Sequence, residues 1–347
     1  MPSSPLVVVG VCTPARRRYA TGLALATHRG LLRVTRTRGG ARDDGTPSGP
    51  VPVGLTRDRH HVERFVIDTE TEVDILHLDL VTRTPSAPIV CVVDARHLLD
   101  DLRDPGPLND HPDAGDDGDV GARARRAVVQ LEAATLICLV QWERVETAEL
   151  SLLMALASHL APRARVRLSR GPAEDLKALT GAEPGDADDE PVLHRAGWMR
   201  ALNDEHDPYM TDARVSTLRY ERLRPFHPAR LLAALDVLDS GRYGSLVRSA
   251  GFCRIATRPD ILARWNQVGS AMWIDPEDAG MEASLTGQDL AITGLDLVPG
   301  AVAAALDEAL LTDAELQVGA AAWATFDDPL PTWPTLADDA LPRDPSP

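Results

Sequence analysis

A short loop near the start of the chain has the layout of a phosphate-binding site. Residues 10–21 read GVCTPARRRYAT; they follow the apolar run PLVVV at 5–9 and precede the apolar stretch LALA at 23–26. This order predicts a strand, a tight loop and a helix. Backbone N–H groups in such a loop, together with the N-terminus of the helix, can hold phosphate groups. The residue types in the loop decide whether that chemistry is present.

The loop departs from the phosphate-binding pattern G-x-x-x-x-G-K-[ST] after its first position. Gly10 is kept, but Ala15, Arg16 and Arg17 stand where the second glycine, the lysine and the hydroxyl residue belong. Glycine lets the backbone approach phosphate, lysine contacts the β- and γ-phosphates, and the hydroxyl binds Mg²⁺. Arginine at position 16 can still pair with phosphate, whereas Arg17 puts a cation where a hydroxyl would face Mg²⁺. We expect weak anion binding at most, without Mg²⁺-assisted hydrolysis.

Composition places the chain among globular proteins of about two domains. It has 347 residues, of which 44% are hydrophobic and 25% charged, and domains usually span ~100–200 residues. No run approaches the ~18 apolar residues of a membrane span, and PLVVVGVC is too short for a signal peptide. We therefore expect a cytoplasmic protein without a membrane partner. The cysteines at 12, 91, 138 and 253 form no Cys-x-x-Cys pair, which argues against disulfides or a closed zinc site.

Charge is distributed unevenly along the chain. The net charge is −16, yet residues 15–42 contain eight arginines and no acid. This stretch could contact a nucleotide or an RNA backbone, or it could simply be exposed arginines beside a strand and a helix. Lys177 is the only lysine beside 35 arginines, so a phosphate-loop lysine is excluded.

The first half alternates between strand and helix patterns. Short, nearly continuous apolar runs are typical of buried parallel strands, and two helical patterns lie between them. The strand runs are 5–9, 64–68, 88–93, 135–140 and 164–168, and the helical patterns are 121–133 and 146–160. The fold class is α/β: we predict a parallel sheet with helices on both faces over residues 1–180. The segment 100–119 is an acidic insertion without apolar periodicity.

The second half predicts a smaller α+β domain at 213–326, joined by a polar linker at 181–212. We expect strands at 214–223, 270–275 and 288–297, and helices after His227 and at 299–310. We also expect two short strands in 244–257 that meet at Ala250-Gly251, and a short helix at 260–268. The Pro- and Asp-rich end, 327–347, is interpreted as a tail or strap.

Several stretches of the second half resemble the C-terminal domain of CobW-type proteins, a family of P-loop GTPases linked to metal handling, especially of zinc. They are RYERLRPFHPARLLAAL, GSLVRSAGFCRIATRPDILARWNQVGSAMWI, ALLTDAEL and AAWATFDDPLPTW, in this order over residues 214–333. The first half is similar in layout, with CVVDARHLLDDL where the family has a strand ending in V-V-D-A. The resemblance implies a P-loop-type parallel sheet followed by a CobW-type α+β domain.

The functional motifs of that family are altered here. The guanine-reading N-K-x-D corresponds to Val140, Gln141, Trp142 and Glu143. The strand end E-[ST]-[ST]-G corresponds to 68–71, where Asp68 keeps a carboxylate and the glycine is lost. The metal motif G-C-x-C-C is missing, because residues 27–67 contain no cysteine. The degenerate nucleotide site implied by the resemblance consists of Gly10, Ala15, Arg16, Arg17, Asp68, Gln141 and Glu143.

Other metal candidates are weaker. Asp94 and His97 flank the end of the 88–93 strand, at the edge where α/β sheets bind ligands. The adjacent pair His60-His61 and the run DEHD at 204–207 are more often plain polar loops. His227 is interpreted as a capping or packing residue, and Trp265 and Trp273 as core residues.

These patterns favour a CobW-like protein of zinc homeostasis whose nucleotide site has decayed and which binds a protein partner under zinc limitation. The ribosome is one such partner, through residues 15–42, since a CobW-like branch that recruits a ribosome hibernation factor shares RPFHP and the L-[TS]-D-x-E ending. That branch has a Cys-x-x-Cys that this chain lacks. The alternatives are a GTP-dependent zinc metallochaperone with an atypical P-loop, using GTP, Mg²⁺ and zinc, and an anion or small-molecule binding module. No DNA partner is expected.

Overall fold

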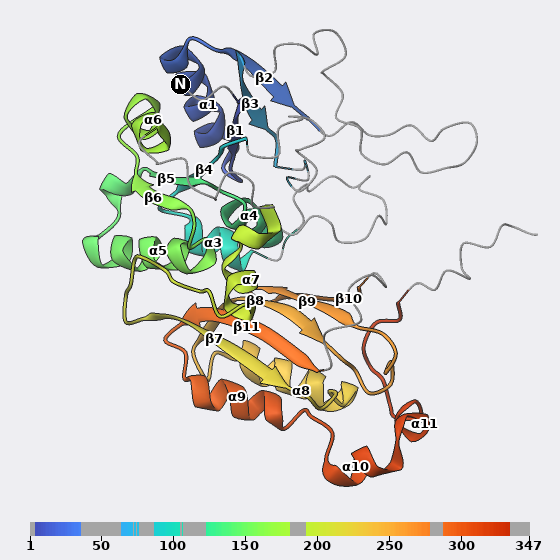
Figure 1. Cartoon of the computed structure of the whole chain (residues 1–347). Coiled ribbons are helices and arrows are strands. Elements are labelled where there is room, and N and C mark those ends of the chain that lie inside the picture. Colours follow the sequence, from blue (N-terminus) through green and yellow to red (C-terminus); the bar gives the residue numbers. More distant parts are fainter. Residues whose placement is uncertain are drawn as a thin grey trace, which may run out of the picture.

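The computed structural model describes residues 4–35, 64–71, 73, 75, 87–104, 106, 123–180, 192–277 and 287–333 (Figure 1). These residues form a parallel sheet in the N-terminal part and an antiparallel sheet in the C-terminal part. Of the expectations above, His60-His61 and most of the acidic insertion at 100–119 lie outside the described residues. The 181–191 part of the linker and the 334–347 part of the tail do too.

The first sheet has six parallel strands in the order β2-β3-β1-β4-β5-β6. Their bounds are β1 Leu6–Val9, β2 Gly30–Val34, β3 Phe65–Thr69, β4 Ile89–Asp94, β5 Leu136–Val140 and β6 Arg165–Leu168. The chain leaves β1 toward β2 on one side and leaves β4 toward β5 on the other, so the strand order reverses between β1 and β4. In open α/β sheets, ligands bind at the carboxyl ends of the strands at such a reversal. The fold therefore directs attention to the residues that follow β1 and β4.

Helices cover both faces of this sheet, which confirms the predicted fold class. The helix α1 (Thr13–Thr27) and α6 (Pro172–Thr180) pack on one face, where Tyr19, Leu23 and Leu176 meet buried strand residues. The other face is covered by α3 (Leu98–Arg103), α4 (Arg123–Glu132) and α5 (Thr147–Leu160). Strands buried on both faces need apolar residues at successive positions, which explains the continuous runs LVVV and IVCVV.

The second sheet is antiparallel, in the order β10-β9-β8-β11-β7. Its strands are β7 Val215–Arg222, β8 Ser245–Cys253, β9 Ala263–Val268, β10 Ala271–Pro276 and β11 Gln288–Leu295. One face packs on α8 (Pro228–Asp239) and α9 (Pro299–Asp307) around Trp265, Tyr220 and Phe226, which are almost fully buried. Trp265 thus belongs to the core as predicted, whereas Trp273 is only partly buried and stacks with Arg125 at 4.9 Å.

Two predictions for this sheet were wrong. Residues 263–268 form strand β9 instead of a helix, because Trp265 and Gln267 turn to the core while Arg264 and Asn266 turn to the other face, which is the period of a strand. Residues 245–253 form one continuous strand instead of two. Gly251 does not turn the chain; its φ of 148° lets β11 approach, since a Cβ there would lie 2.1 Å from the carbonyl oxygen of Asp289.

The described part of the predicted linker, 192–212, does more than join the two sheets. After a 3₁₀ turn at Val192–Arg195, the short helix α7 (Gly197–Leu202) packs Trp198 and Leu202 against Phe252 and Leu262 of the second part. Two other parts of the chain contain short helices. A 3₁₀ turn, Trp142–Arg144, follows β5, and α10 (Asp313–Val318) and α11 (Ala320–Trp323) follow α9. No helix within the described ranges is long and apolar enough to cross a membrane.

The C-terminal segment 327–333 is bound to the second sheet. Arg258 pairs with Asp328 at 3.1 Å and lies 4.2 Å from the ring of Trp333, and the Trp333 indole N–H donates to the carbonyl of Ile274. Leu330 is buried in the same core. Arg258, which anchors this segment, lies in the ATRPD part of a stretch that resembles CobW-type proteins.

Candidate functional site

The loop after β1 is much shorter than a phosphate cradle. β1 ends at Val9 and α1 begins at Thr13, so only residues 10–12 lie between them. The backbone N–H of Arg16 already donates to the carbonyl of Cys12 at 2.9 Å, and Pro14 has no N–H. The residues that would wrap around a phosphate are therefore part of the first helical turn.

Gly10 is required by packing rather than by a ligand. Its φ is 150°, and a Cβ at this position would lie 2.3 Å from the carbonyl oxygen of Val92 in β4. That distance is far below any tolerated contact, so the loop can cross the end of β4 only with glycine. The glycine at the first position of the phosphate pattern thus has a structural explanation of its own in this chain.

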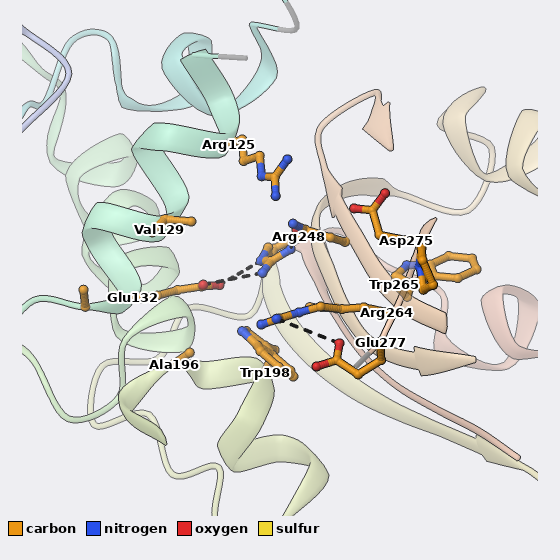
Figure 2. A pocket seen from close by; sticks show the side chains of 14 residues that line it. Arg125, Val129, Glu132, Ala196, Trp198, Arg248, Arg264, Trp265, Asp275 and Glu277 are labelled. Carbon is orange, nitrogen blue, oxygen red and sulfur yellow. Dashed lines mark hydrogen bonds and ion pairs between the residues drawn. The ribbon is translucent and has the colours of Figure 1, made fainter. Parts of the chain in front are cut away.

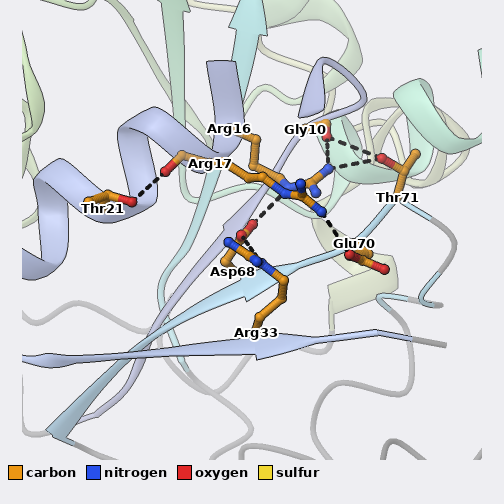
Figure 3. A network of polar contacts seen from close by, with 8 residues as sticks. All are labelled: Gly10, Arg16, Arg17, Thr21, Arg33, Asp68, Glu70 and Thr71. Carbon is orange, nitrogen blue, oxygen red and sulfur yellow. Dashed lines mark hydrogen bonds and ion pairs between the residues drawn. The ribbon is translucent and has the colours of Figure 1, made fainter. Parts of the chain in front are cut away.

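Arg16 turns inward at the place where a phosphate-loop lysine would stand (Figure 3). Its Nε donates to Asp68 Oδ1 at 2.8 Å, and its Nη1 donates to the Gly10 carbonyl at 2.7 Å and to Thr71 Oγ1 at 3.0 Å. The side chain is completely buried. Where the sequence suggested that Arg16 could meet a phosphate, its guanidinium is bonded to acceptors of the protein itself.

Asp68 is the centre of a small ionic network at the end of β3. Its second oxygen accepts from Nε of Arg33 in β2 at 3.1 Å, and its side chain is fully buried. Beside it, Arg17 pairs with Glu70 at 3.1 Å in a more exposed position (Figure 3). Arg16, Arg17 and Arg33 are thus all paired with carboxylates at or just after the end of β3, although the three arginines share only two of them, Asp68 and Glu70.

The candidate base-reading residues lie two strands away from β1, in the loop after β5. Gln141 has a left-handed φ of 58° and Glu143 is exposed. The Trp142 indole N–H donates to the carbonyl of Ser169 at 2.9 Å, which ties the end of β5 to the end of β6. Gly10, Arg16, Arg17 and Asp68 therefore form one cluster, whereas Gln141 and Glu143 are not part of it, and Ala15 packs beside the helix α1 core.

Asp94 is held by a neighbouring arginine instead of being open to a metal. Arg96 donates to its two carboxylate oxygens at 3.0 and 2.6 Å, and the Arg96 backbone N–H adds a third bond. Burial opposes ionisation of Asp94, but the hydrogen bonds from Arg96 outweigh it and hold the pKa of this carboxyl below its usual value. His97 is exposed at the start of α3.

The DEHD run is also engaged in internal contacts. Asp204 pairs with Arg219 at 2.9 Å, Glu205 pairs with Arg200 at 3.0 Å, and His206 Nε2 lies 3.0 Å from the carbonyl oxygen of His159. Across the part of the chain that the structure describes, no group of three or more His, Cys, Asp or Glu side chains could hold a metal ion. The resemblance to a metal-handling family is thus not accompanied by a metal cluster in these residues.

The sequence motifs of the second part have a structural role that the packing explains. Phe226 of RPFHP is fully buried, and His227 stacks on Phe326 at 4.9 Å. Arg230 forms two bonds to Glu315, at 2.9 and 2.7 Å, while Glu315 and Thr312 form a capping box at the start of α10. RPFHP and L-T-D-x-E-L therefore join α8 to α10, and His227 is a packing residue.

Comparison with known proteins indicates the same similarity to the CobW C-terminal domain as these motifs do. Residues 215–310 match the family model of the cobalamin synthesis protein cobW C-terminal domain. The chain is CobW-like. This matched region begins with β7 and ends just beyond α9, so it contains both the antiparallel sheet and the helices that cover it.

Named relatives of this CobW-like chain are linked to zinc. It is 24% identical over 307 residues to the zinc-regulated GTPase metalloprotein activator 1 of Dictyostelium discoideum, over 80% of the chain and 62% of that protein. It therefore spans less than two thirds of the relative's length. It is 33% identical over 84 residues to the zinc chaperone Rv0106 of Mycobacterium tuberculosis, over 24% of the chain and 18% of that protein.

Among solved structures, the Zn(II)-bound YjiA GTPase of E. coli aligns with 90% of the CobW-like chain and 100% of its own, at 12% identity and a TM-score of 0.35.

Sequence reasoning did not find all residues of the cluster. Arg33 was counted only as one of many arginines, because β2 was not predicted as a strand; it is an edge strand with mostly exposed or half-buried residues, and thus has a weak apolar signal. Thr71 was noted only as a lost glycine. The hydroxyl at 71 is nevertheless the third acceptor of Arg16, and a basic residue at the lysine position with new polar partners in 68–71 was the available signal.

Proposed function

We propose that this CobW-like protein acts in zinc homeostasis by binding a protein partner, and that its altered nucleotide site does not hydrolyse GTP. The assignment to zinc homeostasis is supported by the names of the Dictyostelium and Mycobacterium relatives. The observation that carries the second part is the buried bond of Arg16 to Asp68 at the position of the phosphate-loop lysine.

A bound triphosphate would have to replace contacts that are already made. To reach phosphate, Arg16 would leave the carboxylate of Asp68, which is fully buried and would keep only Arg33 as its ionic partner. Removing the buried partner of a buried charge is costly even when a more exposed partner remains. The phosphates would also approach Asp68 and Glu70, which repel them. Nucleotide binding is thus opposed by the cost of breaking the Arg16 pair and by repulsion.

Magnesium-assisted hydrolysis lacks its residues in the cluster. Arg17 stands where the Mg²⁺-binding hydroxyl residue belongs, and its guanidinium pairs with Glu70. A hydrolytic P-loop relies on lysine for the phosphates and a hydroxyl for the metal, and the single lysine of this chain, Lys177, belongs to α6. The relatives' names support the alternative of a GTP-dependent zinc metallochaperone, so that function remains the second candidate.

Titration calorimetry of the full chain with GTP, GDP and ATP, with and without Mg²⁺, distinguishes the proposed function from the second candidate. We expect no binding tighter than about 1 mM, which corresponds to a binding free energy of only ~4 kcal/mol. Two variants are measured beside the unaltered chain: Arg16→Lys, which restores the lysine of the phosphate loop, and Arg17→Ala, a control at the neighbouring position. Micromolar, Mg²⁺-dependent binding of GTP by the unaltered chain would overturn the proposal in favour of the metallochaperone.

We propose that the partner is a protein. The ribosome is one candidate, and the arginines of residues 15–42 would contact it. Of these, Arg29 donates to the carbonyl of Ser4, and Arg18 is exposed on α1; Arg36, Arg38 and Arg42 lie outside the described residues. Co-sedimentation with ribosomes from zinc-starved and zinc-replete cells tests this form. Binding that is lost in the double variant Arg17→Ser with Arg18→Ser would support it, and binding to neither sample would restrict the proposal to other proteins.

A further inference from the structure

A cavity of about 300 Å³ lies between the two sheets, where α4 and the start of α7 face strands β8, β9 and β10 (Figure 2). Both halves of the chain contribute to it, since Arg125 and Glu132 come from α4 and Arg248 and Arg264 from the second sheet. Ligand pockets usually measure ~300–1,000 Å³. This cavity is at the lower end of that range, which suits a molecule smaller than a nucleotide.

The floor of the cavity is an ion pair whose charges cancel. Arg248 Nε lies 2.7 Å from Glu132 Oε1, and the two side chains are only 5% and 8% exposed. Arg248 also donates to Asn266 Oδ1 at 2.6 Å and to two backbone carbonyls. Its donors are used within the protein, so the floor shapes the cavity and leaves recognition of a charged ligand to other residues.

The rim of the cavity carries charges of both signs. Arg264 is 38% exposed, and its Nη1 lies 3.9 Å from Glu277 Oε2, which is too far for a hydrogen bond. Asp275 is directly opposite Arg264 in the β9–β10 register, is exposed and lines the same cavity. Arg125 reaches the rim from α4 (Figure 2). Its guanidinium also lies 4.9 Å from the centre of the Trp273 ring.

Between these charges the wall is apolar. It is formed by Val129 and Ala133 of α4, by Ala196 and Ala250, and by the indole of Trp198, whose ring centre is 6.0 Å from Arg264 Cζ. An apolar or aromatic group placed against Trp198 would also approach the guanidinium of Arg264. The cavity thus combines an apolar wall with a rim on which cationic and anionic side chains lie next to each other.

We propose that this cavity binds a free α-amino acid in its zwitterionic form. The carboxylate faces Arg264, the ammonium faces Asp275, and the side chain lies against Trp198 and Val129. A simple anion would have to lie beside Asp275 and Glu277, and a simple cation beside Arg125 and Arg264, and like charges repel. Only a small molecule that carries both charges meets a partner for each. This inference is independent of the fate of the nucleotide site.

Calorimetry of the full-length chain with each standard amino acid tests the proposal, with saturation-transfer NMR to detect weak binding. For an amino acid that binds, the analogue without the carboxylate and the analogue without the amino group follow; for phenylalanine these are phenethylamine and 3-phenylpropionate. We expect at least one amino acid to bind with a Kd below about 1 mM. Each of its two analogues should bind at least about tenfold more weakly, because one charged contact is lost.

Arg264→Gln and Asp275→Asn should each weaken this binding about tenfold or more, and both residues are exposed enough for the variants to fold. Arg242→Gln and Asp239→Asn are the matched controls, because both residues are exposed and lie outside the cavity lining. Failure of every amino acid to bind would overturn the proposal. So would equal binding of the amino acid and its deaminated analogue, which indicates an anion site, or unchanged binding in Arg264→Gln.

Discussion

Nε of Arg16 lies 2.8 Å from Oδ1 of Asp68, and the two side chains are 1% and 0% exposed to solvent. They come from the first turn of α1 and the end of β3. The guanidinium of Arg16 therefore joins α1 to β3. This buried ion pair depends on both partners: without Arg16, Asp68 keeps only the half-exposed Arg33, and without Asp68, no counter-charge among the described residues lies within reach of the buried Nε of Arg16.

Arg16→Met should lower the free energy of unfolding by about 3–5 kcal/mol, since Asp68 stays buried with a single remaining ionic partner. Arg17→Met is the matched control on the same helix. Arg17 and Glu70 are 46% and 26% exposed, and an exposed pair contributes below about 1 kcal/mol. Urea unfolding followed by circular dichroism measures both changes, and equal losses in the two variants would contradict the role assigned to Arg16.

The double variant Arg16→Met with Asp68→Leu should be more stable than Arg16→Met alone. With the carboxylate removed as well, no buried charge lacks a partner, and apolar replacements of buried ion pairs are often tolerated. Arg33, which is 45% exposed, can then reach water. A double variant less stable than the single one would indicate that Asp68 has another role in the fold.

The parallel sheet could be predicted from the sequence because its strands are buried on both faces. Runs such as LVVV and IVCVV leave few alternatives to a central strand, and the loops that follow such strands mark the candidate site. Edge strand β2 lacks this signal, and with it Arg33 could not be placed beside Asp68. Strand β9 was predicted as a helix because polar residues occur on both of its faces: Gln267 is buried in the core, while Arg264 and Asn266 line the cavity, which obscures the alternation of a half-buried strand.

The direction of the Arg16 side chain could not be predicted either. An arginine at a phosphate-loop lysine position is compatible with a bound phosphate and with an internal carboxylate, and the spacing to Asp68 along the chain does not distinguish them. The same limit applies to the cavity, since Arg125 and Arg264 are far apart in sequence and are brought together only by the packing of α4 on the second sheet.

Gly10→Ala should destabilise the protein by about 2–4 kcal/mol. The new methyl group would lie 2.3 Å from the Val92 carbonyl oxygen, and alanine is strained at a φ of 150°. Gly300→Ala in the first turn of α9 is the control, because no atom lies within 4 Å of its Cβ position. That change should be neutral or stabilise by up to about 1 kcal/mol. Thermal unfolding of both variants decides, and a neutral Gly10→Ala would show that the loop after β1 can move.

Glu132→Gln should weaken the coupling between the two sheets. Arg248 would keep its hydrogen bonds to Asn266 and to backbone carbonyls but lose its buried counter-charge, at a cost of about 2–4 kcal/mol. Asp313→Asn is the control, since the Arg224–Asp313 pair is 45% and 79% exposed and should change stability by less than about 1 kcal/mol. Unfolding of the Glu132 variant should become broader or separate into two steps, whereas a single unshifted transition would exclude this coupling.

His159 should make the stability of the chain fall with acidification. Its Nδ1 lies 2.9 Å from Thr217 Oγ1, which links α5 to β7, and burial, with a smaller effect from nearby His206, lowers its pKa to about 4. The unfolded chain binds the proton near the ordinary pKa of 6.5, so the stabilisation is complete above that pH and is lost as the pH falls from 6.5 toward 4. A pKa difference of one between the folded and unfolded chain is equivalent to about 1.4 kcal/mol, so the free energy of unfolding falls by about 3 kcal/mol over this window.

Urea unfolding between pH 7.5 and 4 should show this loss in the unaltered chain and in His97→Gln, an exposed control, and a smaller loss in His159→Gln. An unchanged pH dependence in His159→Gln would assign the effect to other groups.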